Sequence, residues 1–133
     1  MVTASVTWKG AEEFEAVMPS GNHVTFDGES RKGPGPMEAL LGALGACTAV
    51  DVVSILKKKR QNLLGLEISV SGERAPEPPK VWTKIEMLYR ITGDVDEKAA
   101  RDAIELSKNK YCSVSAMLEK TAKLTYSVQI VKA

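Results

Sequence analysis

Two cysteines are the residues of this sequence whose chemistry could support a reaction. Cys47 lies inside a long apolar stretch, and Cys112 lies near the C-terminal end, in the segment KYCSVS at positions 110–115. Two thiols that meet can act as a redox pair through a reversible disulfide. Free cysteine is also among the most buried residue types, so composition alone favours two inert core thiols.

The surroundings of Cys47 decide whether its thiol could react. It lies about three turns into a predicted helix, so the helix dipole helps it little. Its neighbours one turn away are Ala43, Leu44, Val50 and Asp51. An apolar setting and a nearby carboxylate both disfavour a thiolate. A reactive Cys47 therefore needs a cation from elsewhere, such as an arginine, and without one it should be inert.

The segment Pro36–Arg60 is predicted to form one long helix. Gly35 can cap it, and Glu38 favours its first turn. In its apolar central part the clearly polar residues are Thr48, Asp51 and Ser54. Such a helix should be buried on nearly all sides. The apolar run is too short and too interrupted for a membrane span.

Alternating apolar and polar residues predict six strands around this helix. Three strands before it form a meander, the next two form a hairpin across a proline-rich turn, and the last ends the chain. Their ranges are 2–8, 14–18, 23–26, 66–71, 81–92 and 124–130. An amphipathic helix over 96–110, with Leu106 among its inward residues, and a short helix over 113–121 precede the last strand. The order predicts an α+β fold with a mostly antiparallel sheet, as a single domain over residues 1–133.

The long helix needs more cover than one chain supplies. One sheet covers only one of its sides, and the second helix is too short to cover the rest. A second copy of the chain is the simplest source, so we expect a homodimer.

Charge and composition narrow the classes of partner. Lys+Arg is 18 and Asp+Glu is 17, with 5% aromatic residues, which gives no argument for nucleic acid or a membrane surface. The N-terminal residues carry no signal-peptide pattern, so we expect a cytoplasmic protein with reduced thiols. His23 is the single histidine and the cysteines lack metal-site spacing, so we expect neither a metal nor a cofactor.

The segments around both cysteines resemble the OsmC/Ohr family of osmotically induced and organic-hydroperoxide-resistance proteins. The matching residues are GPGPMEALLGALGACT over 33–48 and YCSVS over 111–115, and the resemblance extends over essentially the whole chain. The run DVVSIL over 51–56 looks like one less characterised subgroup. The resemblance implies an OsmC-like fold and an intertwined homodimer with its sites near the subunit interface.

The resemblance also implies a mechanism. Cys47 would attack a peroxide oxygen as a thiolate and become a sulfenic acid, and Cys112 would condense with it to a disulfide. An external dithiol, such as a lipoylated protein, would then restore both thiols. Family members place an arginine and a glutamate beside the first cysteine. Arg31 and Glu38 are the candidates here, although Met37 occupies the position that matches the family's glutamate.

Both candidates have a simpler interpretation. Arg31 is either the activating cation or a solvated loop residue. Glu38 is either part of the site or an acid that favours the first turn of its helix. Asp51 either pairs with a basic residue or is a hydrogen-bonded buried acid.

Three functions remain open at this point. The first is a thiol-dependent peroxidase that acts on small organic hydroperoxides in oxidative-stress defence. The second is a non-catalytic binding protein that holds a small hydrophobic ligand on the same dimeric fold. The third is a structural dimer with inert cysteines.

Overall fold

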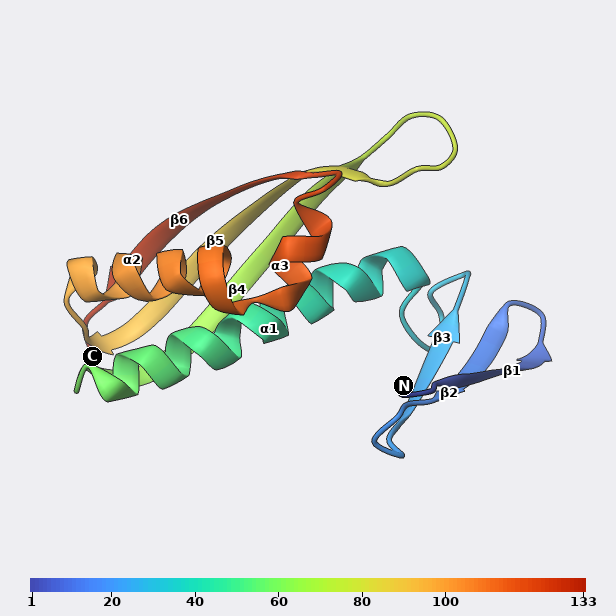
Figure 1. Cartoon of the computed structure of the whole chain (residues 1–133), viewed down its shortest axis with the longest axis horizontal. Helices are drawn as coiled ribbons and strands as arrows, with labels where there is room; N and C mark the ends of the chain where they lie inside the picture. Colours follow the sequence, from blue (N-terminus) through green and yellow to red (C-terminus); the bar gives the residue numbers. More distant parts are fainter. The chain divides into compact units, whose positions relative to one another are not determined.

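The computed structural model describes residues 1–133. The chain forms two compact units, Met1–Leu40 and Leu41–Ala133. The first unit contains three strands and the start of the long helix. The second contains the rest of that helix, three further strands and the remaining helical segments (Figure 1). The fold is therefore a mixed α+β fold with two small sheets and a central helix, which confirms the predicted class.

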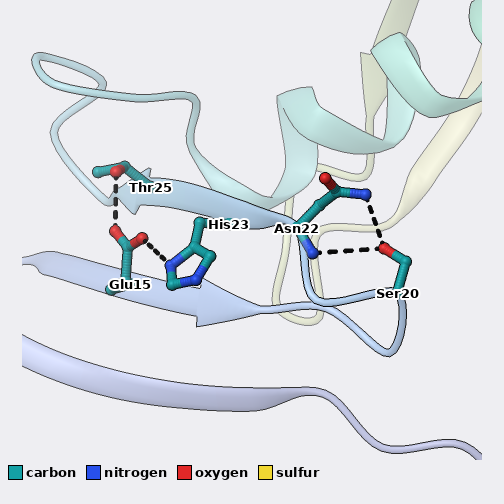
Figure 2. Close-up of polar contacts among 5 residues, drawn as sticks. All are labelled: Glu15, Ser20, Asn22, His23 and Thr25. Carbon is teal, nitrogen blue, oxygen red and sulfur yellow. Dashed lines mark hydrogen bonds and ion pairs between the residues drawn. The ribbon is translucent and has the colours of Figure 1, made fainter.

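The first unit is built on an antiparallel meander of β1 (Ser5–Gly10), β2 (Glu13–Val17) and β3 (His23–Asp27). This confirms the predicted order of the first three strands. A cross-strand polar cluster joins β2 to β3 (Figure 2). The Glu15 carboxylate lies 3.0 Å from His23 Nδ1 and accepts a 3.0 Å hydrogen bond from Thr25. These contacts, the one with His23 first, hold the pKa of Glu15 below its usual value.

The second unit contains a separate sheet with the order β4-β5-β6. Strands β4 (Asn62–Arg74) and β5 (Trp82–Asp94) form the predicted hairpin, but β6 (Lys123–Val131) pairs with β5 in parallel. The expectation of one sheet of about six strands is therefore wrong. The three strands of the meander pair only with one another, before the long helix begins. The helical segments between β5 and β6 form the crossover that a parallel pair requires.

Helix α1 (Pro36–Lys58) begins and ends at identifiable caps. The Glu38 side chain accepts a 2.8 Å hydrogen bond from the Gly35 amide, and the Gly35 carbonyl accepts the Ala39 amide at 3.0 Å. At the other end Arg60 adopts a left-handed φ of 58°, and the next amide, of Gln61, bonds back to the Leu56 carbonyl. This capping arrangement ends the helix two residues before the predicted limit.

One face of α1 is buried inside the chain. The buried residues on this face recur every four positions and form a stripe along the helix. They are Leu44, Thr48, Val52 and Leu56, each at most 1% exposed. The opposite face is open in the single chain, where Val50 is 70% exposed. The expectation of burial on nearly all sides therefore does not hold within one chain. By length and composition alone α1 could cross a membrane, a test that core helices of soluble proteins also pass.

The core of the second unit lies against one face of β5. Its inward residues are Ile85, Met87, Tyr89 and Ile91, all at most 2% exposed. Burial of each such side chain stabilises the fold by roughly 1.5–3 kcal/mol. Both α1 and the helical segment after β5 reach this face of the sheet. Thr48 of α1 hydrogen-bonds to Tyr89 of β5, and Ser107 hydrogen-bonds to Thr48.

The predicted helix over 96–110 divides into two segments. Helix α2 (Glu97–Leu106) begins at Asp96, whose carboxylate accepts the Ala99 amide, and it continues into a π-helical turn, η1 (Ser107–Tyr111). Helix α3 (Ser113–Leu118) follows. The prediction that Leu106 faces inward is wrong, because it is 39% exposed. The inward position four residues after Ala103 belongs instead to Ser107.

Candidate functional site

Cys47 lies midway along α1, next to the stripe that packs on the sheet. Its side chain is half-buried, whereas the following residue, Thr48, is almost fully buried. An apolar groove of about 380 Å³ lies on the side of α1 that faces away from Cys47, and it is lined by Gly45, Ala46 and the β4 residue Ile68, among others. Cys47 is the more accessible member of the pair, because Cys112 is only 3% exposed.

Cys112 lies at the end of the π turn and begins α3. Its side chain is only 3% exposed. Its backbone amide donates a 2.7 Å hydrogen bond to the Ser107 carbonyl, and its Sγ accepts the Ser115 amide at 3.4 Å. Single π turns inside helical segments occur frequently at functional sites. Both backbone bonds fix where the Cys112 sulfur points.

The two thiols lie close enough to influence each other. Burial, as the largest cause, raises the pKa of the Cys112 thiol, the Ser115 side chain lowers it, and the nearby Cys47 thiol raises it further. A raised pKa keeps Cys112 protonated, so it can donate its S–H toward the Cys47 sulfur. The structure thus brings together two residues that lie far apart in the sequence, and it leaves both as free thiols.

A buried chain of hydroxyl groups lies beside the thiols. Ser107 Oγ is 2.9 Å from Thr48 Oγ1 and 2.8 Å from Asp51 Oδ2, and Thr48 Oγ1 is 2.9 Å from the Tyr89 hydroxyl. Burial, as the largest cause, raises the pKa of Tyr89 to about 12, so this hydroxyl keeps its proton. Asp51 is thus a hydrogen-bonded, half-buried acid, which is one of the two roles expected for it.

Sequence reasoning missed three members of this chain, Thr48, Tyr89 and Ser107, as site residues. Thr48 was visible only as a polar residue in an apolar helix. Ser107 occupies the inward position one turn after Ala103, and a serine at an inward helical position is a signal that could have pointed to it. Nothing in the local pattern around Tyr89 distinguishes it from a core residue.

Arg31 and Glu38 both have their partners within the first unit. Arg31 Nε lies 3.2 Å from Glu29, and its side chain is 79% exposed. Glu38 caps the start of α1 through the Gly35 amide. The first-turn role considered for Glu38 is therefore present, and Arg31 occupies an exposed ion pair. No group of three or more His, Cys, Asp or Glu side chains gathers as a metal site.

Two buried serines near the thiols should respond differently to the same substitution. Ser107→Ala removes a hydroxyl that contacts Thr48 and Asp51, and it should lower the free energy of unfolding by about 1–3 kcal/mol. Ser115→Ala removes a buried hydroxyl that makes no well-aligned hydrogen bond. We therefore expect the free energy of unfolding to change by no more than about 0.5 kcal/mol. Urea unfolding of both reduced variants measures the difference, and equal losses would contradict it.

The fold and the two thiols together define a class of protein. It is an α+β protein in which a long helix and a later π turn place two free cysteines close to each other. The family model for OsmC-like proteins matches residues 27–127, and the chain belongs to this family. The resemblance around the two cysteines is thereby confirmed.

Individual relatives agree with this assignment. Protein YhfA of Escherichia coli K12 is 42% identical over 132 residues, and the match covers 98% of each chain. A solved structure of a hypothetical protein from Aquifex aeolicus VF5 has a TM-score of 0.91 and 35% identity, covering 100% of this chain and 98% of that one. OhrB of Bacillus subtilis, an organic hydroperoxide resistance protein, has a TM-score of 0.69 and 14% identity, covering 96% and 98%, and it shares the fold alone.

Proposed function

We propose that this protein reduces small organic hydroperoxides with Cys47 as the attacking thiol and Cys112 as the resolving thiol. The observation that carries the proposal is the closeness of a half-buried and a fully buried free thiol. Membership of a family that includes organic hydroperoxide resistance proteins supports the substrate class. The role in the cell would be oxidative-stress defence.

The proposed reaction has two steps. The Cys47 thiolate attacks the terminal peroxide oxygen, the O–O bond breaks, and the alkoxide leaves and takes up a proton as the alcohol. Cys47 is then a sulfenic acid. In the second step Cys112 attacks this sulfur, the S–O bond breaks, water leaves, and a Cys47–Cys112 disulfide remains. Two electrons pass from the thiol pair to each peroxide.

The burial of each thiol supports this division of roles. Cys47 is the more accessible, so a substrate can reach it first. Cys112 is buried with a raised pKa, which suits a group that stays protonated until its partner has been oxidised. The apolar neighbours of Cys47 on α1, such as Ala43 and Leu44, favour an alkyl or acyl peroxide over hydrogen peroxide.

The proposal includes an activating charge and an external reductant. Arg31 would supply the cation for the Cys47 thiolate and Glu38 would orient it, and each would have to leave its present partner, Glu29 or Gly35. An external dithiol, such as a lipoylated protein, would reduce the disulfide. A reducing, cytoplasmic compartment suits such a cycle because it keeps both thiols ready.

We also propose that two copies of the chain form the working protein. The outward face of α1 is apolar, and its neighbouring groove is lined by Leu41, Ala49, Leu66, Ile68 and Val70, among others. A soluble chain that leaves such a face uncovered is expected to bury it against another surface. A symmetric second copy is the simplest partner because it brings the same face.

A second candidate function is supported by the same groove. Its mainly apolar lining could hold a small hydrophobic ligand without any reaction at the thiols. This candidate predicts a lipid-like molecule in mass spectra of the purified protein and thiols that persist in excess peroxide.

The first experiment is a titration of the reduced protein with cumene hydroperoxide in a stopped-flow instrument. We expect both free thiols to disappear for each equivalent of peroxide, and peptide mapping to recover a Cys47–Cys112 disulfide. Hydrogen peroxide at the same concentration should react more slowly, by about tenfold or more, because it has no alkyl group to contact the apolar neighbours of Cys47. Thiols that survive excess cumene hydroperoxide in folded protein would contradict the peroxidase proposal.

A further inference from the structure

The buried hydroxyl chain has a direction set by its donors and acceptors. A carboxylate only accepts, and each hydroxyl has one proton to donate. Ser107 therefore donates to Asp51, Thr48 donates to Ser107, and Tyr89 donates to Thr48. Tyr89, Thr48 and Ser107 are at most 1% exposed, so water does not replace these bonds. A chain satisfied in this order favours one arrangement of the three elements that carry it.

The hydroxyl chain links α1, the helix that carries Cys47, to the π turn that precedes Cys112. Thr48 follows Cys47 directly, and Asp51 lies one turn beyond Cys47 on α1. Ser107 begins the π turn, and its carbonyl accepts the Cys112 amide at 2.7 Å. The Ser107 side chain thus bonds to the helix that carries Cys47, while its backbone bonds to Cys112.

A disulfide requires tightly limited geometry. The two Cα atoms must lie about 4.4–6.8 Å apart with a defined S–S dihedral, so a shift of roughly 1 Å between the two segments reduces closure. Apolar packing alone allows such shifts, because it has little directional preference. Hydrogen bonds from a single buried hydroxyl to two residues of α1 restrict that sliding.

We infer that Ser107 is a positioning residue that, through Thr48 and Asp51, holds the π turn against α1 so that Cys112 stays in closing distance of Cys47. The inference rests on the disulfide that the proposed function requires. Ser107 itself takes no part in bond making. Its loss should lower the tendency of the pair to close, with little effect on attack by Cys47 on a peroxide.

The test measures disulfide closure without any peroxide. Reduced protein is equilibrated with mixtures of reduced and oxidised glutathione, and the fraction of Cys47–Cys112 disulfide gives an effective concentration. In the closing reaction one cysteine thiolate attacks glutathione disulfide and releases one glutathione. The second cysteine displaces the other glutathione, so two electrons and the two cysteine protons end on two molecules of reduced glutathione.

The test compares variants within the hydroxyl chain with one control variant outside it. Ser107→Ala and Thr48→Val should lower the effective concentration by about tenfold or more. Thr48→Ser keeps the hydroxyl and should remain within about twofold of the wild type. Tyr126→Phe is a control, because it removes a 2.7 Å hydrogen bond to Glu105 outside the chain, and it should also remain within about twofold.

Folding is checked on each reduced variant by near-UV circular dichroism. Thr48→Val is nearly isosteric and decides the question if Ser107→Ala does not fold. An effective concentration within twofold of the wild type in folded Thr48→Val would overturn the inference, as would a wild type that forms no disulfide in glutathione. A wild type that closes its disulfide but ignores hydroperoxides would contradict the proposed function and leave this inference standing.

Discussion

Substitution of Cys47 by serine is expected to abolish hydroperoxide reduction, while substitution of Cys112 by serine should leave the first step intact. A serine hydroxyl is not ionised near neutral pH and is a far weaker nucleophile toward peroxide oxygen than a thiolate. We expect the single-turnover rate of peroxide consumption in Cys47→Ser to fall by about three orders of magnitude or more.

The Cys112→Ser variant separates the two steps. Without the resolving thiol, the Cys47 sulfenic acid should accumulate, and dimedone should trap it in a form that mass spectrometry locates. Excess peroxide should then oxidise Cys47 further to the sulfinic and sulfonic acids. The wild type avoids this over-oxidation because it closes the disulfide first.

The two variants serve as controls for each other, because each replaces one sulfur by oxygen. The buried Cys112 position should tolerate the change with only modest loss of stability, since serine is slightly smaller. If Cys112→Ser rather than Cys47→Ser removed the first step, the proposed roles would be reversed. If neither did, the thiols would not be the reacting groups.

The sequence contains enough information for the elements and too little for their pairing. The long apolar run with Gly35 and Glu38 at its start predicted α1 nearly to the residue, because caps and periodicity are local properties. The direction of β6 is not local. A connection of two helical segments before it was a signal for a parallel crossover, and the alternation of Leu124 with its neighbours says nothing about direction.

The candidate site was predictable only in part for a related reason. Both cysteines were identified from the residues around them, but their contact depends on how α1 meets the π turn. The hydrogen bond between Thr48 and Ser107 joins residues 59 positions apart, and no local pattern encodes such a pair. The extra residue that makes the π turn is likewise invisible to a helical periodicity, which assumes a constant rotation per residue.

The hydroxyl chain also bears on why α1 is polar where it is. The clearly polar residues in the central part of α1 include Thr48 and Asp51, and both hydrogen-bond to Ser107. The opposite face of α1 carries Val50 and Val53 together with Ser54 and Lys57. The proposed second copy would cover the apolar part of this surface around Val50.

A carboxylate placed on that surface should separate the proposed dimer. Val50 is 70% exposed in the single chain, so Val50→Glu should not disturb the core of its own chain. In a symmetric interface the substitution occurs twice, and each carboxylate would lose its hydration on burial. We expect the dissociation constant to rise by about 100-fold or more, which corresponds to roughly 2.7 kcal/mol.

Sedimentation velocity over a range of concentrations measures this shift. Met117→Glu is the matched control, because it places the same charge on an apolar residue that is 76% exposed and belongs to a different helix, α3. This control should sediment as the wild type does. A wild type that is monomeric at tens of micromolar would contradict the dimer, and so would a Val50→Glu variant that associates as tightly as Met117→Glu. Loss of association in Val50→Glu alone would locate the interface on the face of α1 that the hydroxyl chain leaves free.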